Sequence, residues 1–376
     1  MIISITNAVQ ETFIVGAVLL LALIISVRRR KDPSFFPTQT TVELKGLASL
    51  MVIFSHIGYS LVIDNRFLVP LSNYAGVGVN LFLILSGYGL VTAILRRPIS
   101  IGKFYLKRLQ RICLPVASTV LFFLALDFFF LHRTYPLKTI IENILGFFPS
   151  ADVNLDLNSP LWYITLLLAY CFLFPLIFRR RFPALSALAM AGAGWLVIRY
   201  IPQLNIFSEV VLKLYKLHFL AFPLGMAMGA LIHQPPVFVA KTVEGLGRML
   251  KKYRPATIAR WLLIILAGGV LIYTYYHSHV GEDWKKEAVT SLFTATAIFT
   301  LFVFKKINFK ILTLFGLFSF EIYLLHWPLL SRYNFLYGKI PASLATIIYL
   351  GLFLGAGYLY HQFISKFFLP KPKPTP

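Results

Sequence analysis

Lys45 and His56 are the two residues whose types and spacing point most directly to chemistry. They stand at the ends of the stretch KGLASLMVIFSH, which is otherwise mostly apolar, and they are eleven residues apart. In a helix this is about three turns, so both side chains lie on one face, roughly 16 Å apart along the axis. An ionisable group inside a membrane costs on the order of a few kcal/mol and usually faces a polar cavity or a partner. Either these two residues form part of a functional site, or they are a snorkelling lysine and a histidine bonded to a neighbouring helix.

Arg108 and Arg111 form a second candidate site, in the stretch FYLKRLQRICLP. Being three residues apart, they share one face of a helix. Paired guanidinium groups at the end of a membrane helix suit a phosphate ligand, because they offer permanently charged, bidentate donors. Charges that only set the topology of the chain would explain them as well, and Arg96, Arg97 and Lys103 nearby fit that alternative.

Polar residues also occur inside the apolar stretch GVGVNLFLILSGYGL, residues 76–90. Asn80 and Ser86 are candidates for binding or supporting a substrate. The glycines of this stretch permit close approach of a second helix, so helix packing alone is an alternative explanation. These glycines are Gly76, Gly78, Gly87 and Gly89.

Two later stretches complete the set of candidate residues. Trp162 and Tyr163 open a predicted span at the depth of the membrane interface, where an aromatic belt would also explain them. Glu321 and His326 lie within the stretch GLFSFEIYLLHWPLL. Burial of either ionisable side chain in a membrane is unfavourable in free energy unless the side chain has a polar or charged partner. Five residues correspond to about 140° around a helix, so these two need not share one site.

The elements that must position these residues are membrane helices. The chain has 376 residues, of which 58% are hydrophobic and 13% charged, whereas soluble domains carry about 25% charged residues. Long apolar runs recur throughout, which predicts an all-α polytopic membrane protein with about eleven transmembrane helices. The expected spans are 8–27, 42–63, 72–95, 109–131, 159–178, 183–201, 213–232, 259–277, 288–304, 311–330 and 342–364.

The distribution of basic residues predicts the topology. With the N-terminus outside, 25 of the 36 Lys and Arg residues fall on the cytoplasmic side, ten fall outside, and Lys45 lies within a span. The positive-inside rule therefore places the C-terminus in the cytoplasm. It also accounts for the net charge of +22, so we expect no nucleic-acid partner. The first span lacks a basic leading region and is not an ordinary signal peptide.

No soluble domain is expected outside the membrane spans. The longest outer loop covers about 132–158, the longest inner loop about 233–258, and the tail KPKPTP is predicted to be disordered. The two cysteines, Cys113 and Cys171, form neither a disulfide framework nor a metal-ligand spacing, and we expect no metal site. The nucleotide-binding and hydrolase motifs are also absent from the sequence.

Taken together, these stretches resemble the acyltransferase-3 family of integral membrane acyltransferases. The resemblance covers roughly residues 38–365. It rests on a basic residue, ten residues and a histidine at Lys45 and His56, on the glycine-rich pattern from Gly76 to Gly87, and on the RxxR of Arg108 and Arg111. The pair Leu161-Trp162 and the run IYLLHWP, from Ile322 to Pro328, complete it. All five occur in the order and spacing of the family.

This resemblance implies a ten-helix core, preceded here by one extra N-terminal helix and basic loop in residues 1–37 and followed by a basic cytoplasmic tail in residues 366–376. It also implies transfer of an acyl group, most often acetyl, from cytoplasmic acyl-CoA to a hydroxyl of a cell-surface or lipid-linked glycan, in a bacterial cytoplasmic membrane. Other polysaccharide-assembly proteins are expected partners. Two departures matter: Leu167 stands where many members have glutamate, and Asn80 where many have aspartate.

The mechanism expected on this basis gives each candidate a role. Lys45, Arg108 and Arg111 hold the phosphates of acyl-CoA. His56 acts as general base on the acceptor hydroxyl, or carries the acyl group, and burial favours the neutral imidazole that a base requires. Asn80, Ser86 or another buried donor stabilises the oxyanion, and Glu321 orients a partner or is simply paired. A transporter or flippase of lipid-linked sugars is the main alternative, and a scaffold in a polysaccharide assembly is a third.

Overall fold

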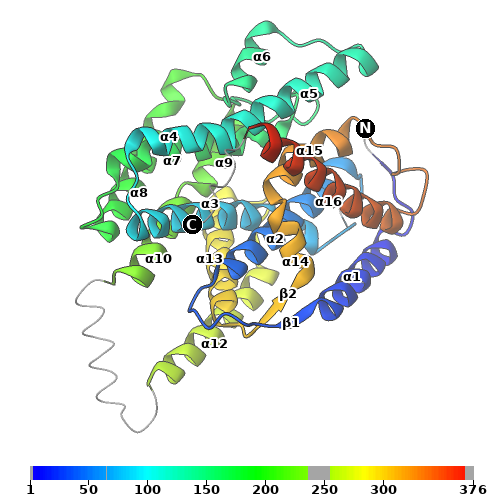
Figure 1. The fold of residues 1–376 in the computed structure, drawn as a ribbon. Helices are drawn as coiled ribbons and strands as arrows, with labels where there is room; N and C mark the ends of the chain where they lie inside the picture. The colour runs from blue at the N-terminus through cyan, green and yellow to red at the C-terminus, as the bar shows by residue number, and fades with distance from the viewer. Residues whose placement is uncertain (1–2, 65, 236–254, 369–376) are drawn as a thin grey trace.

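The computed structural model describes residues 3–64, 66–235 and 255–368. Nearly all regular structure in these ranges is helical, with one pair of short strands (Figure 1). Most of the expected inner loop 233–258 and the whole of the expected disordered tail KPKPTP lie outside the described residues. The helices and strands are α1 Ala8–Ile25, β1 Val27–Arg29, α2 Thr38–Ser55, α3 Ala75–Arg96, α4 Ile101–Arg108, α5 Leu114–Leu131, α6 Leu137–Ile144, α7 Trp162–Ile177, α8 Pro183–Tyr200, α9 Glu209–His218, α10 Ala221–His233, α12 Pro255–Tyr276, α13 Trp284–Phe304, β2 Ile307–Phe309, α14 Lys310–Leu317, α15 Ser319–Ser331 and α16 Ala342–Phe367.

The prediction of an all-α polytopic membrane protein is confirmed. Among the described residues, nine helical segments are long and apolar enough to cross a membrane, and the bent pair of α14 and α15 makes a tenth if it counts as one span. The remaining expected span, 259–277, coincides with α12, in which Arg260–Tyr276 forms a shorter apolar helix. Every expected span therefore has a helix, or a pair of helices, at its position.

One expected span is not a single helix. We predicted a continuous span over 311–330, but α14 and α15 meet at an angle of 76°. The break is at Phe318, whose backbone (φ −112°, ψ 17°) is not helical. Hydropathy does not reveal this bend, because both halves are apolar. Before the bend, α14 packs closely on α2: a side chain at Gly316 would collide with the Val42 carbonyl, so only glycine permits this approach.

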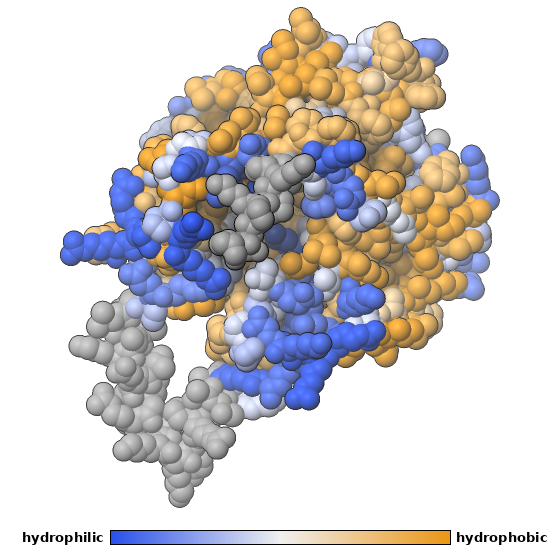
Figure 2. All heavy atoms as spheres, viewed as in Figure 1, coloured by the Kyte–Doolittle hydropathy of each residue, from blue (hydrophilic) through white to orange (hydrophobic). Residues whose placement is uncertain are grey.

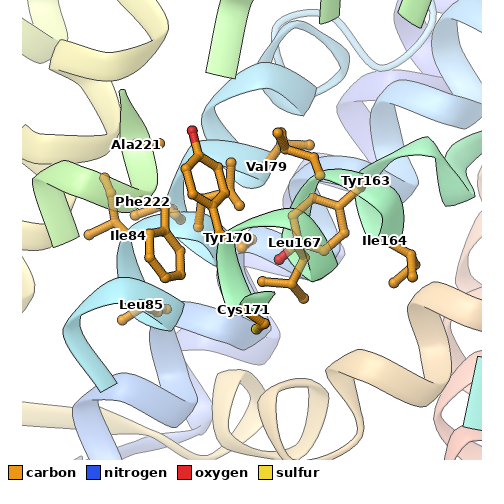
Figure 3. Close-up of a cluster of buried hydrophobic side chains, with 14 of the residues drawn as sticks. Val79, Ile84, Leu85, Tyr163, Ile164, Leu167, Tyr170, Cys171, Ala221 and Phe222 are labelled. Atoms are coloured by element: carbon orange, nitrogen blue, oxygen red, sulfur yellow. The ribbon is translucent and has the colours of Figure 1, made fainter. Parts of the chain in front are cut away.

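The core is centred on the crossing of α3 and α10. A side chain at Gly87 would collide with the Phe222 carbonyl, and one at Gly225 with the Ile84 carbonyl, so each helix presents a glycine to the backbone of the other. Beside this crossing, Tyr170 of α7 stacks on Phe222, with ring centroids 4.6 Å apart (Figure 3).

The other glycines of α3 differ in their surroundings. Gly78 also lies close to α2, because a side chain there would come within 2.8 Å of the Ala48 carbonyl oxygen. Gly76 makes only ordinary contacts, and a side chain at Gly89 would meet nothing within 4 Å. Close helix approach therefore explains Gly78 and Gly87 but neither Gly76 nor Gly89.

Helix α1 lies at the edge of the molecule, beside α14 and α16 (Figure 1). Both of its ends are tied to the rest of the chain by backbone hydrogen bonds. Before α1, Ile3 donates to Leu61 (2.7 Å) and accepts from Ile63 (3.1 Å). After it, β1 pairs antiparallel with β2, with Val27 opposite Phe309. The extra N-terminal helix is thus anchored to the segment after α2 and to the segment before α14.

Candidate functional site

Helix α2 carries both residues of the first motif. It begins at Thr38, after Pro37, and at His56 it passes into a π-helical turn that ends at Leu61. Such turns within helices occur frequently at functional sites. Lys45 lines an internal cavity, whereas His56 is partly exposed and is not among the residues that line it. Lys45 and His56 therefore belong to two different groups of residues, one at the cavity and one around His326.

His56 meets His326 of α15, which is fully buried. His56 Nδ1 and His326 Nε2 are 2.7 Å apart. His326 Nδ1 faces the carbonyl oxygens of Tyr323 at 2.8 Å and Ile322 at 3.1 Å, and because carbonyls only accept hydrogen bonds, this nitrogen carries a proton. In a neutral His326 the Nε2 is then an acceptor, so His56 donates from Nδ1. This arrangement leaves the lone pair of His56 on Nε2, as a general base requires.

Trp327 lies directly beside this histidine pair. Its ring packs edge-on against His56, with centroids 5.3 Å apart, and it is 2% exposed. Its indole Nε1 is buried and has no hydrogen-bond partner among the described residues. A buried donor without a partner is uncommon, since it costs roughly 1–3 kcal/mol. Trp327 therefore offers a free N–H group next to the candidate base.

The position of α15 depends on a proline and an asparagine. Pro328 has no N–H, so the carbonyl of Leu324, four residues earlier, lacks its normal helical donor. The Asn158 side chain fills this place, donating from Nδ2 to the Leu324 oxygen at 2.9 Å. The loop that ends at Asn158 thereby holds the helix that carries His326.

The cavity at Lys45 has a volume of about 470 Å³. Three cations line it: Lys45 from α2, Arg108 from the end of α4, and Arg111 from the π-helical turn that follows. Its lining contains no carboxylate, and Arg108 Nε is buried without a hydrogen-bond partner among the described residues. A phosphate-bearing ligand fits this chemistry, because it would supply the missing acceptors and counter-charge.

Helix α7 forms one wall of the same cavity. Tyr163, Leu167 and Cys171 follow one another at intervals of four residues, and each lines the cavity; Figure 3 shows all three on this helix. At the position where many relatives were expected to have glutamate, the cavity wall is therefore the apolar Leu167. Ser86 of α3 also lines the cavity, but its hydroxyl donates to the Phe82 carbonyl at 2.8 Å.

Tyr323 connects the cavity with the histidine pair. Its side chain lines the cavity and packs edge-on against Tyr163, with ring centroids 5.5 Å apart, and its hydroxyl donates to the Pro160 carbonyl. Its own carbonyl accepts from His326. One residue of α15 thus contacts both the cationic cavity and the hydrogen-bond chain that ends at His56.

Asn80 and Trp162 lie in a separate cluster around His218. Asn80 Oδ1 accepts from His218 Nδ1 at 2.8 Å, and its Nδ2 donates to Ser291 Oγ at 3.1 Å. The Trp162 ring stacks on His218, with centroids 5.6 Å apart. Neither Asn80 nor Trp162 lines the cavity. These contacts join α3, α7, α9 and α13 in the core.

Glu321 and His326 have different partners, as their angular separation around the helix indicated. Glu321 binds His361 of α16, with Oε1 and Nδ1 2.7 Å apart. The sequence reasoning missed Tyr323, His218 and Trp327. The argument that drew attention to His56, an ionisable residue inside an expected span, would also have found His218. Tyr323 and Trp327 lie in the run from Ile322 to Pro328 that carried the resemblance, but the sequence reasoning gave neither a role. Among the described residues, no group of three or more His, Cys, Asp or Glu side chains could hold a metal ion.

Comparison with known proteins gives one match. A family model described as an acyltransferase domain matches residues 44–361, a range that includes every candidate residue named above and leaves out α1. No curated protein and no solved structure matches the chain.

Proposed function

This chain belongs to the acyltransferase-3 family and is a membrane acyltransferase, and we propose that it transfers acetyl from cytoplasmic acetyl-CoA to a hydroxyl of a cell-surface or lipid-linked glycan. The observation that carries this proposal is the link through Tyr323. It joins a cavity lined by three cations to a histidine pair in which one imidazole nitrogen remains free to accept a proton.

The donor occupies the cationic cavity in this proposal. Arg108 and Arg111 bind the CoA phosphates and Lys45 adds a third charge at the same end. A volume of about 470 Å³ lies in the range of small-molecule sites, roughly 300–1,000 Å³. The positive-inside rule puts this end of the spans in the cytoplasm, where acyl-CoA is available, with the N-terminus of the chain outside and its C-terminus inside. The thioester then points toward Tyr323 and the histidines.

His56 is the catalytic residue of the proposal. As the acceptor oxygen attacks the thioester carbonyl carbon, the hydroxyl proton passes to His56 Nε2. The carbon–sulfur bond then breaks and the departing CoA sulfur takes up the proton. His326 is a positioning residue, because it touches neither substrate in this scheme and acts by holding the His56 tautomer. In the variant route, His56 Nε2 attacks the thioester carbon, the carbon–sulfur bond breaks and CoA leaves as the thiolate. The acceptor oxygen then takes the acyl group as the nitrogen–carbon bond breaks, and its proton passes to the CoA sulfur.

The oxyanion needs a hydrogen-bond donor. The candidate donors can be ranked by whether each already has a hydrogen-bond partner. Ser86 already donates to a backbone carbonyl, and Asn80 is engaged by His218 and Ser291. The Trp327 ring packs against His56, and its Nε1 has no hydrogen-bond partner among the described residues. We therefore assign the oxyanion contact to Trp327 in place of Asn80 or Ser86. A donor aimed at the developing charge contributes about 10²–10³ in rate.

The test uses the purified full-length chain in lipid, acetyl-CoA labelled in the acetyl group, and wild type beside His56→Ala and Arg108→Ala. We expect CoA release in the wild type, none with His56→Ala, and weakened acetyl-CoA binding with Arg108→Ala. Lys103→Ala is the matched control, because Lys103 is an exposed cation of α4 that does not line the cavity. Label retained on the wild type would select the covalent route. A folded wild type that does not bind acetyl-CoA would reject the proposal and favour a transporter of lipid-linked sugars.

A further inference from the structure

We infer that a second pocket, at the paired strands β1 and β2, binds the phosphate headgroup of an anionic phospholipid. This basic pocket has a volume of about 530 Å³. Six cationic side chains line it: Arg29, Arg30, Lys31, Arg260, Lys305 and Lys306. The inference does not depend on the proposed acetyl transfer, since none of these residues lines the cavity at Lys45.

The fold brings these charges together from three parts of the chain. The pairing of β1 with β2 sets Arg29 opposite Ile307, and Arg30 N donates to the Lys306 oxygen at 3.2 Å. The Arg30 guanidinium donates to the carbonyls of Val303 (3.3 Å) and Lys305 (3.1 Å), so it joins the end of α13 to the segment after α1. The extra N-terminal segment, which lies outside the family match, therefore builds half of this pocket.

The charges in the pocket are only partly compensated. Asp32 is the one carboxylate that lines it, and Asp32 Oδ1 accepts from the backbone N–H of Ser34 at 2.8 Å. Lys305 is paired with Glu43 of α2, whose side chain is fully buried. Arg29, Lys31 and Lys306 are exposed.

Besides this excess of positive charge, Arg260 has a hydrogen-bond donor without a partner among the described residues. Its Nη2 donates to the Phe304 carbonyl at 3.1 Å, but its Nε is buried without a hydrogen-bond partner among the described residues. The positive-inside rule requires basic residues on the cytoplasmic side, but it does not require that they converge on one pocket. A phosphate would supply both the acceptor and the negative charge that the basic pocket lacks.

The surroundings of the pocket favour a lipid over a soluble phosphate. Figure 2 shows hydrophilic atoms gathered over the β1–β2 pair, next to a hydrophobic surface on the side of α1. Exposed large apolar side chains lie close in sequence to the residues that line the pocket, or line it themselves: Ile24 61%, Ile25 65%, Phe35 56%, Trp261 55% and Ile307 40%. Two of them end the apolar helix α1 and one lies in the apolar helix α12, so in this proposal the acyl chains extend along these helices while the headgroup sits among the cations.

The test is native mass spectrometry of the purified full-length chain with dioleoylphosphatidylglycerol or dioleoylphosphatidylcholine, which share acyl chains and differ in headgroup charge. We expect the wild type to bind the anionic lipid at least about tenfold more tightly, since each basic residue near a membrane surface is worth about 1 kcal/mol toward anionic lipid. The double variant Arg29→Gln/Lys306→Gln should lose this tenfold preference for the anionic lipid. The matched control, Arg97→Gln/Lys103→Gln, removes two exposed cations outside the basic pocket and should keep it.

Several outcomes would overturn the inference. Equal binding of the two lipids by the wild type would do so, and so would a preference unchanged in Arg29→Gln/Lys306→Gln. Displacement of the lipid by millimolar inorganic phosphate would assign the pocket to a soluble anion. Loss of acetyl-CoA binding in the same double variant, with an unchanged melting temperature, would make the pocket part of the donor site. Failure of the wild type to turn over acetyl-CoA would leave the lipid result unaffected, so the two proposals fail separately.

Discussion

His56 and His326, 270 residues apart in the sequence, form a direct hydrogen bond of 2.7 Å between two helices. Because the carbonyls of Ile322 and Tyr323 fix the proton of His326 on Nδ1, the direction of this bond is fixed too. His56 is the donor, and its Nε2 is the free nitrogen. The tautomer of the candidate base is thus determined by the backbone of α15, a relationship common in catalytic histidines.

Replacing His326 tests this relationship. His326→Phe should lower kcat by about 10²-fold or more, because His56 loses the acceptor that holds its tautomer. The variant His326→Gln keeps a side-chain oxygen that can accept a hydrogen bond from His56 Nδ1. It should therefore recover part of the lost kcat. The measurement is kcat and KM for acetyl-CoA across pH, and we expect KM to stay within about twofold. Equal loss in both variants with a parallel rise in KM would point to a merely structural role.

Arg108 and Arg111 should govern affinity for the donor. Removing either guanidinium deletes charge-assisted hydrogen bonds worth about 1.5–3 kcal/mol, so acetyl-CoA binding should weaken by about 10- to 100-fold. Arg108→Lys should restore little, because an ammonium lacks the bidentate geometry. Isothermal titration with acetyl-CoA measures this, and Lys103→Ala provides the baseline. Acetyl-pantetheine, which carries no phosphate, should bind the variants and the wild type equally if the arginines bind phosphate. The dephospho form of acetyl-CoA, which lacks only the 3′-phosphate, should do so only if the arginines bind that group.

Trp327 should affect kcat and not the binding of acetyl-CoA. Trp327→Phe keeps an aromatic ring against His56 but removes the Nε1 donor, and we expect kcat to fall by about 10²-fold at an unchanged KM. The control is Trp162→Phe, since Trp162 packs on His218 away from the cavity. Comparable losses in both variants would argue for general packing effects and against an oxyanion contact.

Asn158 should contribute to stability through the carbonyl that Pro328 leaves free. Asn158→Leu keeps the volume but leaves the Leu324 oxygen buried without a donor, which costs about 1–3 kcal/mol. Thermal unfolding in detergent should show a lower melting temperature. Asn154→Leu, at an exposed position of the same loop, should not. A stable Asn158→Leu variant would mean that another group satisfies this oxygen.

The membrane class and most spans could be predicted because hydropathy is a local property of the sequence. The spacing of Arg108 and Arg111 indicated a shared phosphate site, but only the resemblance gave Lys45 the same role. All three residues line one cavity. The pairing of His56 with His326 could not be predicted, since helical periodicity gives the direction of a side chain but not which helix lies opposite. The bend at Phe318 also escaped prediction, because both halves of the expected span are apolar and hydropathy does not distinguish them from one continuous helix.

The two ties of α1 have a mechanical consequence. An α-helix of 18 residues is about 27 Å long, so α1 separates its two ties by about that length. The tie before α1 is the hydrogen bond to Leu61, the last residue of the turn that starts at His56, and the tie after α1 is the strand pair beside the basic pocket. Helix α1 therefore sets the spacing between the turn at His56 and the proposed lipid headgroup. Loss of α1 would remove both ties at the same time.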